Sequence, residues 1–294
     1  MEKIFYKDRP AVLLTAGDAK MTVLPEDGGK IASLSFGNCE FLEQDPGKIY
    51  RRLSYGGDFV KSECASWDDM FPTVDPETVT VGEKEAFLPD HGEIVRVPLA
   101  FTEENGTLRL FFASKSLPYT FEKRITATEN GFRVSWKIKN TAEAFFPCLW
   151  AAHVMLRGAE DLRVSVPMPD SAPVRYVFGE EAAEKPHGRL LKKSADDIPY
   201  KYYYTQPLPR GELTVRYEES GEEMHVLFDE KTLPYIGLWH NAGGFQNKYN
   251  IAPELATAPY DRPSAAKKAG VNAGLMPLEE KEIVLDLCFS GGRK

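Results

Sequence analysis

Short runs of alternating apolar and polar residues, separated by turn-forming residues, recur along the whole chain. Phe132, Val134, Trp136 and Ile138 alternate with polar or charged neighbours, as in an antiparallel strand with one buried face. We expect further strands at residues 20–24, 30–36, 108–113, 119–126, 162–167, 174–178, 213–217, 225–228, 236–239 and 278–289. Many short strands with few helices predict an all-β protein, built as a sandwich or a barrel.

Several segments depart from this alternation. Residues 146–156 are apolar apart from His153, which predicts a strand buried on both faces. Residues 49–75 show weak periodicity, which is typical of a functional loop or of a cover over a site. The remaining predictions are a strand at residues 94–99, a short helix at 180–185, a tyrosine-rich loop at 196–209 and a helical turn at 265–270.

Composition narrows the classes of ligand. The chain has 294 residues and a formal net charge of −8, which argues against nucleic acid or anionic membrane surfaces as partners. No composition shift marks a linker, so residues 1–294 are interpreted as one domain, large enough to fold without disulfides or metal. No signal peptide or membrane span is recognised. We therefore expect a cytoplasmic protein with a neutral small-molecule ligand. The sequence does not indicate an oligomeric state.

Three residues are candidates for acid–base chemistry. Glu254 follows a short apolar run and lies between Pro253 and Pro259; prolines would stiffen the backbone around a carboxylate, although a tight surface turn has the same composition. His153 lies in the apolar run, where it is either a neutral core histidine or an acid or base in a pocket. His91 lies between a turn and the next predicted strand, and a structural role is the alternative there.

An aromatic residue beside two acids forms a possible sugar-binding group. Trp67 precedes Asp68 and Asp69; a ring face packs on sugar C–H groups, and carboxylates accept hydrogen bonds from hydroxyls. The alternative is a loop pinned into a small core by Trp67 and Phe71. The four cysteines form no C-x-x-C motif, and no H-x-H or H-E-x-x-H spacing indicates a metal site.

The candidates suit the opening of a sugar hemiacetal. Neither a nucleophile elbow nor a phosphate-binding glycine loop is present, so acyl transfer and nucleotide use are not indicated. In hemiacetal opening, a base removes the anomeric hydroxyl proton while an acid protonates the ring oxygen. With ordinary pKa values of about 4.3 and about 6.5, glutamate and histidine need little adjustment for these roles at neutral pH.

Four segments, in order, resemble the aldose 1-epimerase (galactose mutarotase-like) superfamily. They are MTVLPEDGGKIASL, LPDHGEIVRVPL with His91, AAHVML with His153, and IAPELATAPYDRP with Glu254 followed by LMPLEEKEIVLDLCF. The resemblance implies a large antiparallel β-sandwich with a sugar site on its concave face. It also implies Glu254 as the general base, His153 as the general acid, His91 as a ligand-binding residue and no cofactor.

The chain also departs from this family. The Asn-Arg segment of classical members is not recognised, and Arg51 and Arg52 are candidates for its role. Asp68 and Asp69, in SWDDMFPTVDP, are candidates for the sugar-binding aspartate; that segment resembles a divergent bacterial branch and the hexose-6-phosphate branch. Trp239 is assigned to substrate binding. The alternatives to an aldose mutarotase are a hexose-6-phosphate mutarotase, a carbohydrate-binding protein without turnover, and a lyase or hydrolase on the same scaffold.

Overall fold

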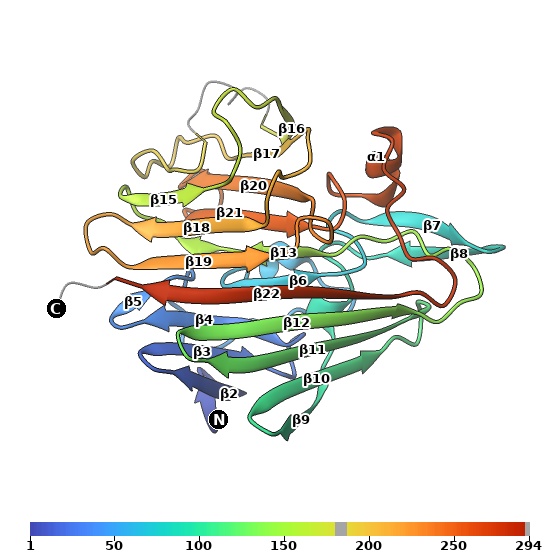
Figure 1. The fold of residues 1–294 in the computed structure, drawn as a ribbon, viewed down its shortest axis with the longest axis horizontal. Helices are drawn as coiled ribbons and strands as arrows, with labels where there is room; N and C mark the ends of the chain where they lie inside the picture. The colour runs from blue at the N-terminus through green and yellow to red at the C-terminus, as the bar shows by residue number, and fades with distance from the viewer. Residues whose placement is uncertain (180–186, 292–294) are drawn as a thin grey trace.

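The computed structural model of this protein describes residues 1–179 and 187–291. Two large antiparallel sheets are stacked on each other, and a separate hairpin and one short helix lie at one end (Figure 1). The hairpin consists of β7 (Glu77–Val81) and β8 (Lys84–Leu88), and the helix is α1 (Pro263–Lys268). The prediction of an all-β antiparallel sandwich is confirmed.

The large sheet has 12 strands and contains the strands of His153 and Glu254. In spatial order its main path is β1 (Glu2–Tyr6), β2 (Arg9–Ala16), β3 (Ala19–Leu24), β4 (Lys30–Phe36), β6 (Trp67–Met70), β13 (Ala151–Val154), β21 (Tyr249–Ala256), β20 (Tyr235–Ala242), β17 (Tyr200–Tyr204) and β16 (Val174–Phe178). Two short strands pair beside this path: β5 (Cys39–Glu40) with β4, and β14 (Leu156–Arg157) with β21.

The small sheet has eight strands and covers one face of the large sheet. Its order is β15 (Leu162–Ser165), β18 (Glu212–Tyr217), β19 (Glu223–Phe228), β22 (Glu280–Ser290), β12 (Gly131–Asn140), β11 (Tyr119–Thr128), β10 (Thr107–Ala113) and β9 (Ala100–Glu104). In β12 the alternating residues Phe132, Val134, Trp136 and Ile138 are all buried. The half-buried strand that this alternation predicts is therefore β12, with its apolar face in the core.

A buried ion pair crosses the core between the sheets. Lys123 Nζ of β11 lies 2.8 Å from Asp69 Oδ2 of β6, and Trp136 Nε1 donates to the same oxygen at 3.0 Å. Both charged side chains have no exposed surface. Because side chains alternate along a strand, Asp68 and its ladder partner His153 point to the opposite face of the large sheet.

Several predicted elements differ from the structure. Residues 94–99 do not form a strand; they begin with the 3-10 helix η2 (Ile94–Arg96). The tyrosine-rich loop contains strand β17, whose five residues are all buried and so show no alternation. Residues 146–156 contain only the short strand β13 and the start of β14. Residues 49–75 contain the 3-10 helix η1 (Phe59–Lys61) and β6, and the helix predicted at 180–185 lies outside the described residues.

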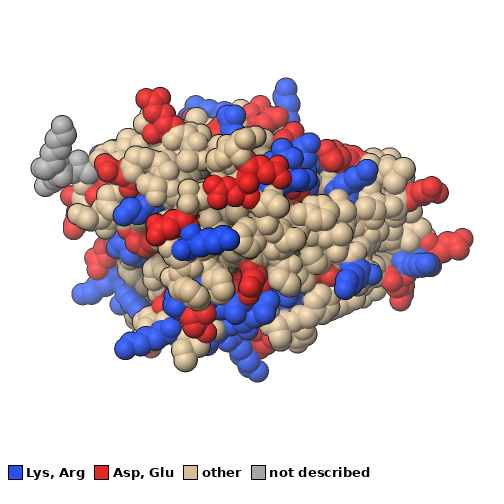
Figure 2. Space-filling model, turned by 90° about the horizontal axis from the view of Figure 1, so that it is seen from below, with Lys and Arg blue, Asp and Glu red and all other residues tan. Residues whose placement is uncertain are grey.

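The surface carries charges of both signs. In the view from below, Lys and Arg side chains are interspersed with Asp and Glu side chains across the face (Figure 2). Among the helices of the described residues, none is long and apolar enough to cross a membrane.

Candidate active site

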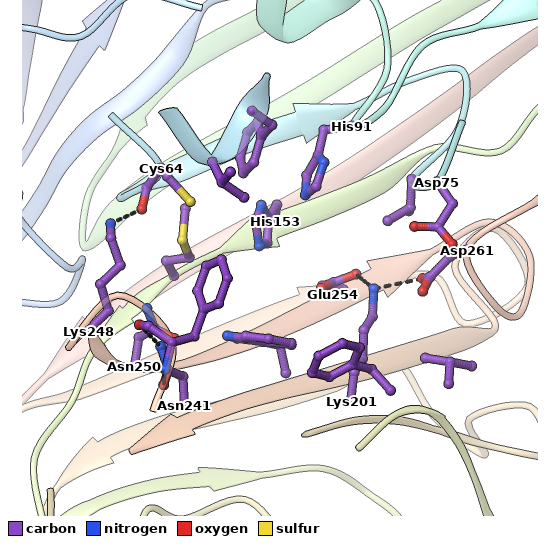
Figure 3. Close-up of a pocket in the computed structure, with 18 residues that line it drawn as sticks. Cys64, Asp75, His91, His153, Lys201, Asn241, Lys248, Asn250, Glu254 and Asp261 are labelled. Carbon is purple, nitrogen blue, oxygen red and sulfur yellow. Dashed lines mark hydrogen bonds and ion pairs between the residues drawn. The ribbon is translucent and has the colours of Figure 1, made fainter. Parts of the chain in front are cut away.

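A cavity of about 220 Å³ lies on the face of the large sheet turned away from the small sheet. Side chains from β13, β16, β17, β20 and β21 line it, together with residues of the loops that contain Phe59, Asp75, His91 and Asp261 (Figure 3). The predicted residues His91, His153, Trp239 and Glu254 all line this cavity.

The strand register brings Glu254 and His153 together. β13 pairs with β21 through Ala151 and Ala256, and β14 pairs with the same strand through Leu156 and Ile251. Both pairs belong to one continuous register, which sets His153 opposite Glu254 with the two side chains on the same face. Glu254 is 2% exposed and His153 is 7% exposed, so both side chains are shielded from bulk water.

A glycine on the neighbouring strand makes room for a long side chain. Gly237 of β20 lies opposite Glu254, and Tyr203 of β17 lies opposite Gly237. A Cβ atom at Gly237 would lie 2.7 Å from Tyr203 Cζ, a separation that real side chains do not adopt. Without it, the Tyr203 hydroxyl extends to Asp261 and donates to Oδ1 at 2.8 Å.

Lys201 holds two carboxylates at one end of the cavity. Its Nζ lies 2.6 Å from Glu254 Oε2 and 2.6 Å from Asp261 Oδ1 (Figure 3). Burial alone would lower the pKa of Lys201, but the ion pairs with Asp261 and Glu254 raise it above its ordinary value. The backbone of Asp261 is fixed as well, because the amides of Val74 and Asp75 donate to its carbonyl at 3.2 and 2.8 Å.

Burial raises the pKa of Glu254 to about 7, against the opposing effect of Lys201. The neighbouring carboxylate Asp261 adds to the rise. Asp75, which also lines the cavity, has a pKa raised by burial and then by Asp261. Glu254 is therefore half ionised near neutral pH, where a carboxylate can both accept and return a proton.

Two histidines line the same cavity, His153 on β13 and His91 in the loop after β8. His91 has φ of 55°, its Nδ1 lies 3.0 Å from Asp90 Oδ2, and its ring stacks on Phe59 with centroids 3.7 Å apart. The His91 and His153 rings are 5.4 Å apart. Burial, reinforced by His91 and Lys201, lowers the pKa of His153 well below 6.5. His153 is thus a neutral imidazole, and its Nδ1 has no hydrogen-bond partner among the described residues.

The opposite end of the cavity is aromatic and amide-rich. Trp239 contacts Phe178 and Phe245, with ring centroids 5.5 and 6.0 Å away. Asn241 and Asn250 are ladder partners on β20 and β21, and both line the cavity. Trp239 therefore provides a ring face beside the space where a ligand would lie.

Three predicted binding residues lie outside the cavity lining. Trp67 is buried and packs against Trp136, with ring centroids 6.4 Å apart. Asp68 Oδ2 is 2.8 Å from Lys30 Nζ, in an ion pair that is almost fully buried. Asp69 points into the core toward Lys123. These side chains are held by interactions within the protein, and we assign them no contact with a ligand.

The two predicted arginines are also engaged elsewhere. Arg51 NH2 lies 2.8 Å from Asp45 Oδ2 and donates to the Ser62 carbonyl at 3.1 Å. Arg52 Nε lies 3.1 Å from Asp27 Oδ1. Among residues 1–179 and 187–291, no arginine lines this cavity.

The sequence alone did not identify Lys201, Asp261 or Asn250 as site residues. Lys201 is the one charged residue in the run YKYYY, and a lysine inside an apolar strand was a signal that could have been used. Asp261 belongs to a segment that resembles the family, but its link to Lys201 depends on pairing across 60 residues. Within the described part of the chain, no group of three or more His, Cys, Asp or Glu side chains is arranged to hold a metal ion.

Comparisons with known proteins support the fold. Neither the protein-family models nor the curated proteins gave a match. Among solved structures, Slr1438 from Synechocystis sp. PCC 6803 has a TM-score of 0.73 at 16% identity, covering 99% of this chain and 100% of its own. A galactose mutarotase-like protein from Clostridium acetobutylicum has a TM-score of 0.69 at 14% identity, covering 99% and 98%.

The structure of a galactose mutarotase related enzyme from Lactobacillus acidophilus matches this chain about as well. Its TM-score is 0.67 at 15% identity, and the match covers 97% of this chain and 98% of that one. The three matches extend over nearly the whole chain at low sequence identity. The chain therefore has the galactose mutarotase-like fold, as the sequence resemblance implied.

Proposed function

We propose that the protein is an aldose mutarotase, which interconverts the two anomers of a neutral sugar by opening and reclosing its ring. The observation that carries this proposal is the position of Glu254 opposite His153 in one buried cavity. The galactose mutarotase-like fold supports it, because the matched enzyme from Lactobacillus acidophilus is described as galactose mutarotase related. The reaction as proposed uses no cofactor.

In the proposed reaction, ionised Glu254 takes the proton of the anomeric hydroxyl. The electron pair of that O–H bond forms the C1=O1 double bond, and the C1–O5 bond breaks with its electrons on the ring oxygen. That oxygen takes a proton from the acid, and the aldehyde turns about C1–C2. The steps then reverse on the other face of C1, so that Glu254 and the acid regain their starting protonation states.

His153 is the proposed acid. Its imidazole is neutral in the empty cavity because its pKa is low, so it begins the reaction as a hydrogen-bond donor to the ring oxygen. Negative charge develops on that oxygen as the C1–O5 bond breaks, and the oxygen takes the N–H proton of the imidazole. The imidazole becomes an imidazolate and recovers the proton from the same oxygen when the ring closes. His91, held by Asp90, is proposed to bind the same oxygen or a neighbouring hydroxyl.

The charges in the cavity favour a neutral sugar over a sugar phosphate. Both lysines that line it are already engaged: Lys201 by Glu254 and Asp261, and Lys248 by the Cys64 carbonyl. A phosphate dianion in the cavity would lie close to carboxylates. Among the described residues that line the cavity there is no arginine to bind it. A hexose-6-phosphate mutarotase is therefore the less favoured candidate.

The test is the rate at which pure anomers equilibrate. Freshly dissolved α-D-glucose, α-D-galactose and glucose 6-phosphate are followed by polarimetry with and without the protein. We expect faster equilibration of a neutral sugar and a smaller effect on the phosphate ester. Calorimetric binding of a sugar without any exchange above the buffer rate would contradict the proposal and favour a binding protein without turnover.

A further inference from the structure

Asn250 lines the cavity and has a hydrogen-bond acceptor that no described residue uses. The residue is 1% exposed, it lines the cavity, and its Oδ1 has no donor among the described residues. Leaving a buried polar atom without a partner has a cost in stability. A ligand hydroxyl that donates to Oδ1 would remove this cost and gain binding energy from it.

The orientation of the Asn250 amide is set by its neighbours. Its Nδ2 donates to Glu43 Oε2 at 2.6 Å, and Lys248 Nζ lies 4.0 Å from the same carboxylate oxygen. An ionised carboxylate only accepts hydrogen bonds, so the NH₂ group must face Glu43 and the amide oxygen points away from Glu43. Burial raises the pKa of Glu43, and the positive charge of Lys248 opposes that rise.

The spacing along β21 matches one sugar ring. Glu254 and Asn250 are four residues apart on the same face of the strand, which corresponds to about 13 Å between their Cα atoms. Two hydrogen bonds of about 2.8 Å leave about 7 Å between the two ligand oxygens. This span is long enough for one sugar ring to lie between the two side chains, with its anomeric hydroxyl toward Glu254 and a far-side hydroxyl toward Asn250. Ala252 lies between the two residues on the same strand, and its ladder partner on β20 is Trp239.

We infer that Asn250 determines specificity by accepting a hydrogen bond from a ring hydroxyl on the side away from the anomeric carbon. Glu43 and Lys248 act as positioning residues, because they hold the amide oxygen toward the ligand. The inference rests on the proposed function for the placement of the anomeric carbon at Glu254. It defines the substrate as a neutral single-ring aldose that carries a free hydroxyl at this position.

The experiment compares the affinities of a parent sugar and its deoxy analogues by calorimetry. The probes are D-glucose and D-galactose with their 2-, 3-, 4- and 6-deoxy derivatives. In the parent protein, one deoxy analogue should bind about 10-fold or more weakly than the sugar it derives from, because the missing hydroxyl leaves Oδ1 of Asn250 unpaired. In Asn250→Ala the ratio of the two dissociation constants, analogue over parent sugar, should fall close to one. In Glu43→Gln the same ratio should fall part of the way.

Met155→Ala is the matched control, since it changes the cavity wall without removing a hydrogen bond. It should weaken the parent sugar and the deoxy analogue equally. The inference is overturned if every deoxy analogue binds as tightly as its parent, or if Asn250→Ala leaves the ratio unchanged. Selective binding without anomer exchange would support this inference and reject the mutarotase, whereas exchange without hydroxyl selectivity would do the reverse.

Discussion

At the scale of single residues, the site owes its chemistry to neighbours distant in sequence. Glu254, the proposed base, has a pKa of about 7 because it is buried, and Lys201 keeps that value from rising further. Sequence motifs made His91, His153 and Glu254 candidates, because each lies in a segment resembling a known family, and the three line one cavity. They could not identify Lys201 and Asp261, whose roles arise only when β17 lies beside the loop after β21.

The pH dependence of activity follows from this arrangement. Only ionised Glu254 can accept the anomeric proton, so kcat/KM should rise with pH, with a midpoint near 7, and level off above it. In Lys201→Met the cation that lowers the pKa of Glu254 is lost, so the midpoint should move to higher pH. Lys201→Arg keeps the charge and should keep the midpoint. The measurement is kcat/KM between pH 5 and 9, and a midpoint that moves down in Lys201→Met would disprove the assignment.

The pH dependence of the free energy of unfolding should reflect the ionisation of Glu254. The pKa of Glu254 is raised in the folded state, so the folded state binds this proton more tightly than the unfolded chain. Its contribution is present below about pH 4.5 and is lost as the pH rises through about 7. Urea unfolding of the parent and of Glu254→Gln at pH 4.5 and pH 8 measures this. Relative to the variant, the parent should be less stable at pH 8 than at pH 4.5, and the opposite trend would contradict the raised pKa.

At the scale of elements, alternation predicted strands with one wet face and failed where both faces are buried. β12 alternates and was found, whereas β17 reads YKYYY, is buried throughout and was read as a loop. Glu254 was read as part of a stiff loop or surface turn because of its prolines, yet it lies within strand β21. That strand pairs continuously with β20, while its pairing toward β13 and β14 is interrupted around Pro253.

Gly237 tests how the strands form the site. Gly237→Ala should destabilise the protein by about 1–3 kcal/mol, because the new Cβ would overlap Tyr203 and force it from Asp261. Gly56→Ala is the control, since a Cβ atom there meets nothing within 4 Å. Urea unfolding of both variants gives the comparison. Equal stability of the two variants would show that Tyr203 does not need the space at Gly237.

At the scale of the whole molecule, the two sheets are joined by an apolar core that contains the buried ion pair of Lys123 and Asp69. The sequence placed Asp69 in a sugar site, because an aromatic residue beside two acids has the composition of one. Composition cannot show that Lys123, 54 residues away, lies against it in the core. The all-β sandwich was predictable because it depends on many alternating strands, and each contributes independently to that conclusion.

Asp69→Asn should therefore reduce stability and leave the site intact. Removing one partner leaves Lys123 as an uncompensated buried charge, at a cost of about 3–5 kcal/mol. The control is Asp286→Asn, which breaks the exposed pair with Arg133 and should cost at most about 1 kcal/mol. Sugar affinity of folded Asp69→Asn should match that of the parent, since Asp69 does not line the cavity. A selective loss of affinity at unchanged stability would return Asp69 to the sugar site.

The most direct measurement of the central claim is the anomer exchange rate of Glu254→Gln beside that of the parent protein, recorded by NMR exchange spectroscopy on the best neutral aldose. Glutamine has the same shape but cannot accept the proton. We predict a fall of at least about 100-fold, as expected for the loss of a general base, with an unchanged far-ultraviolet circular dichroism spectrum. An exchange rate equal to that of the parent would show that Glu254 is not the base.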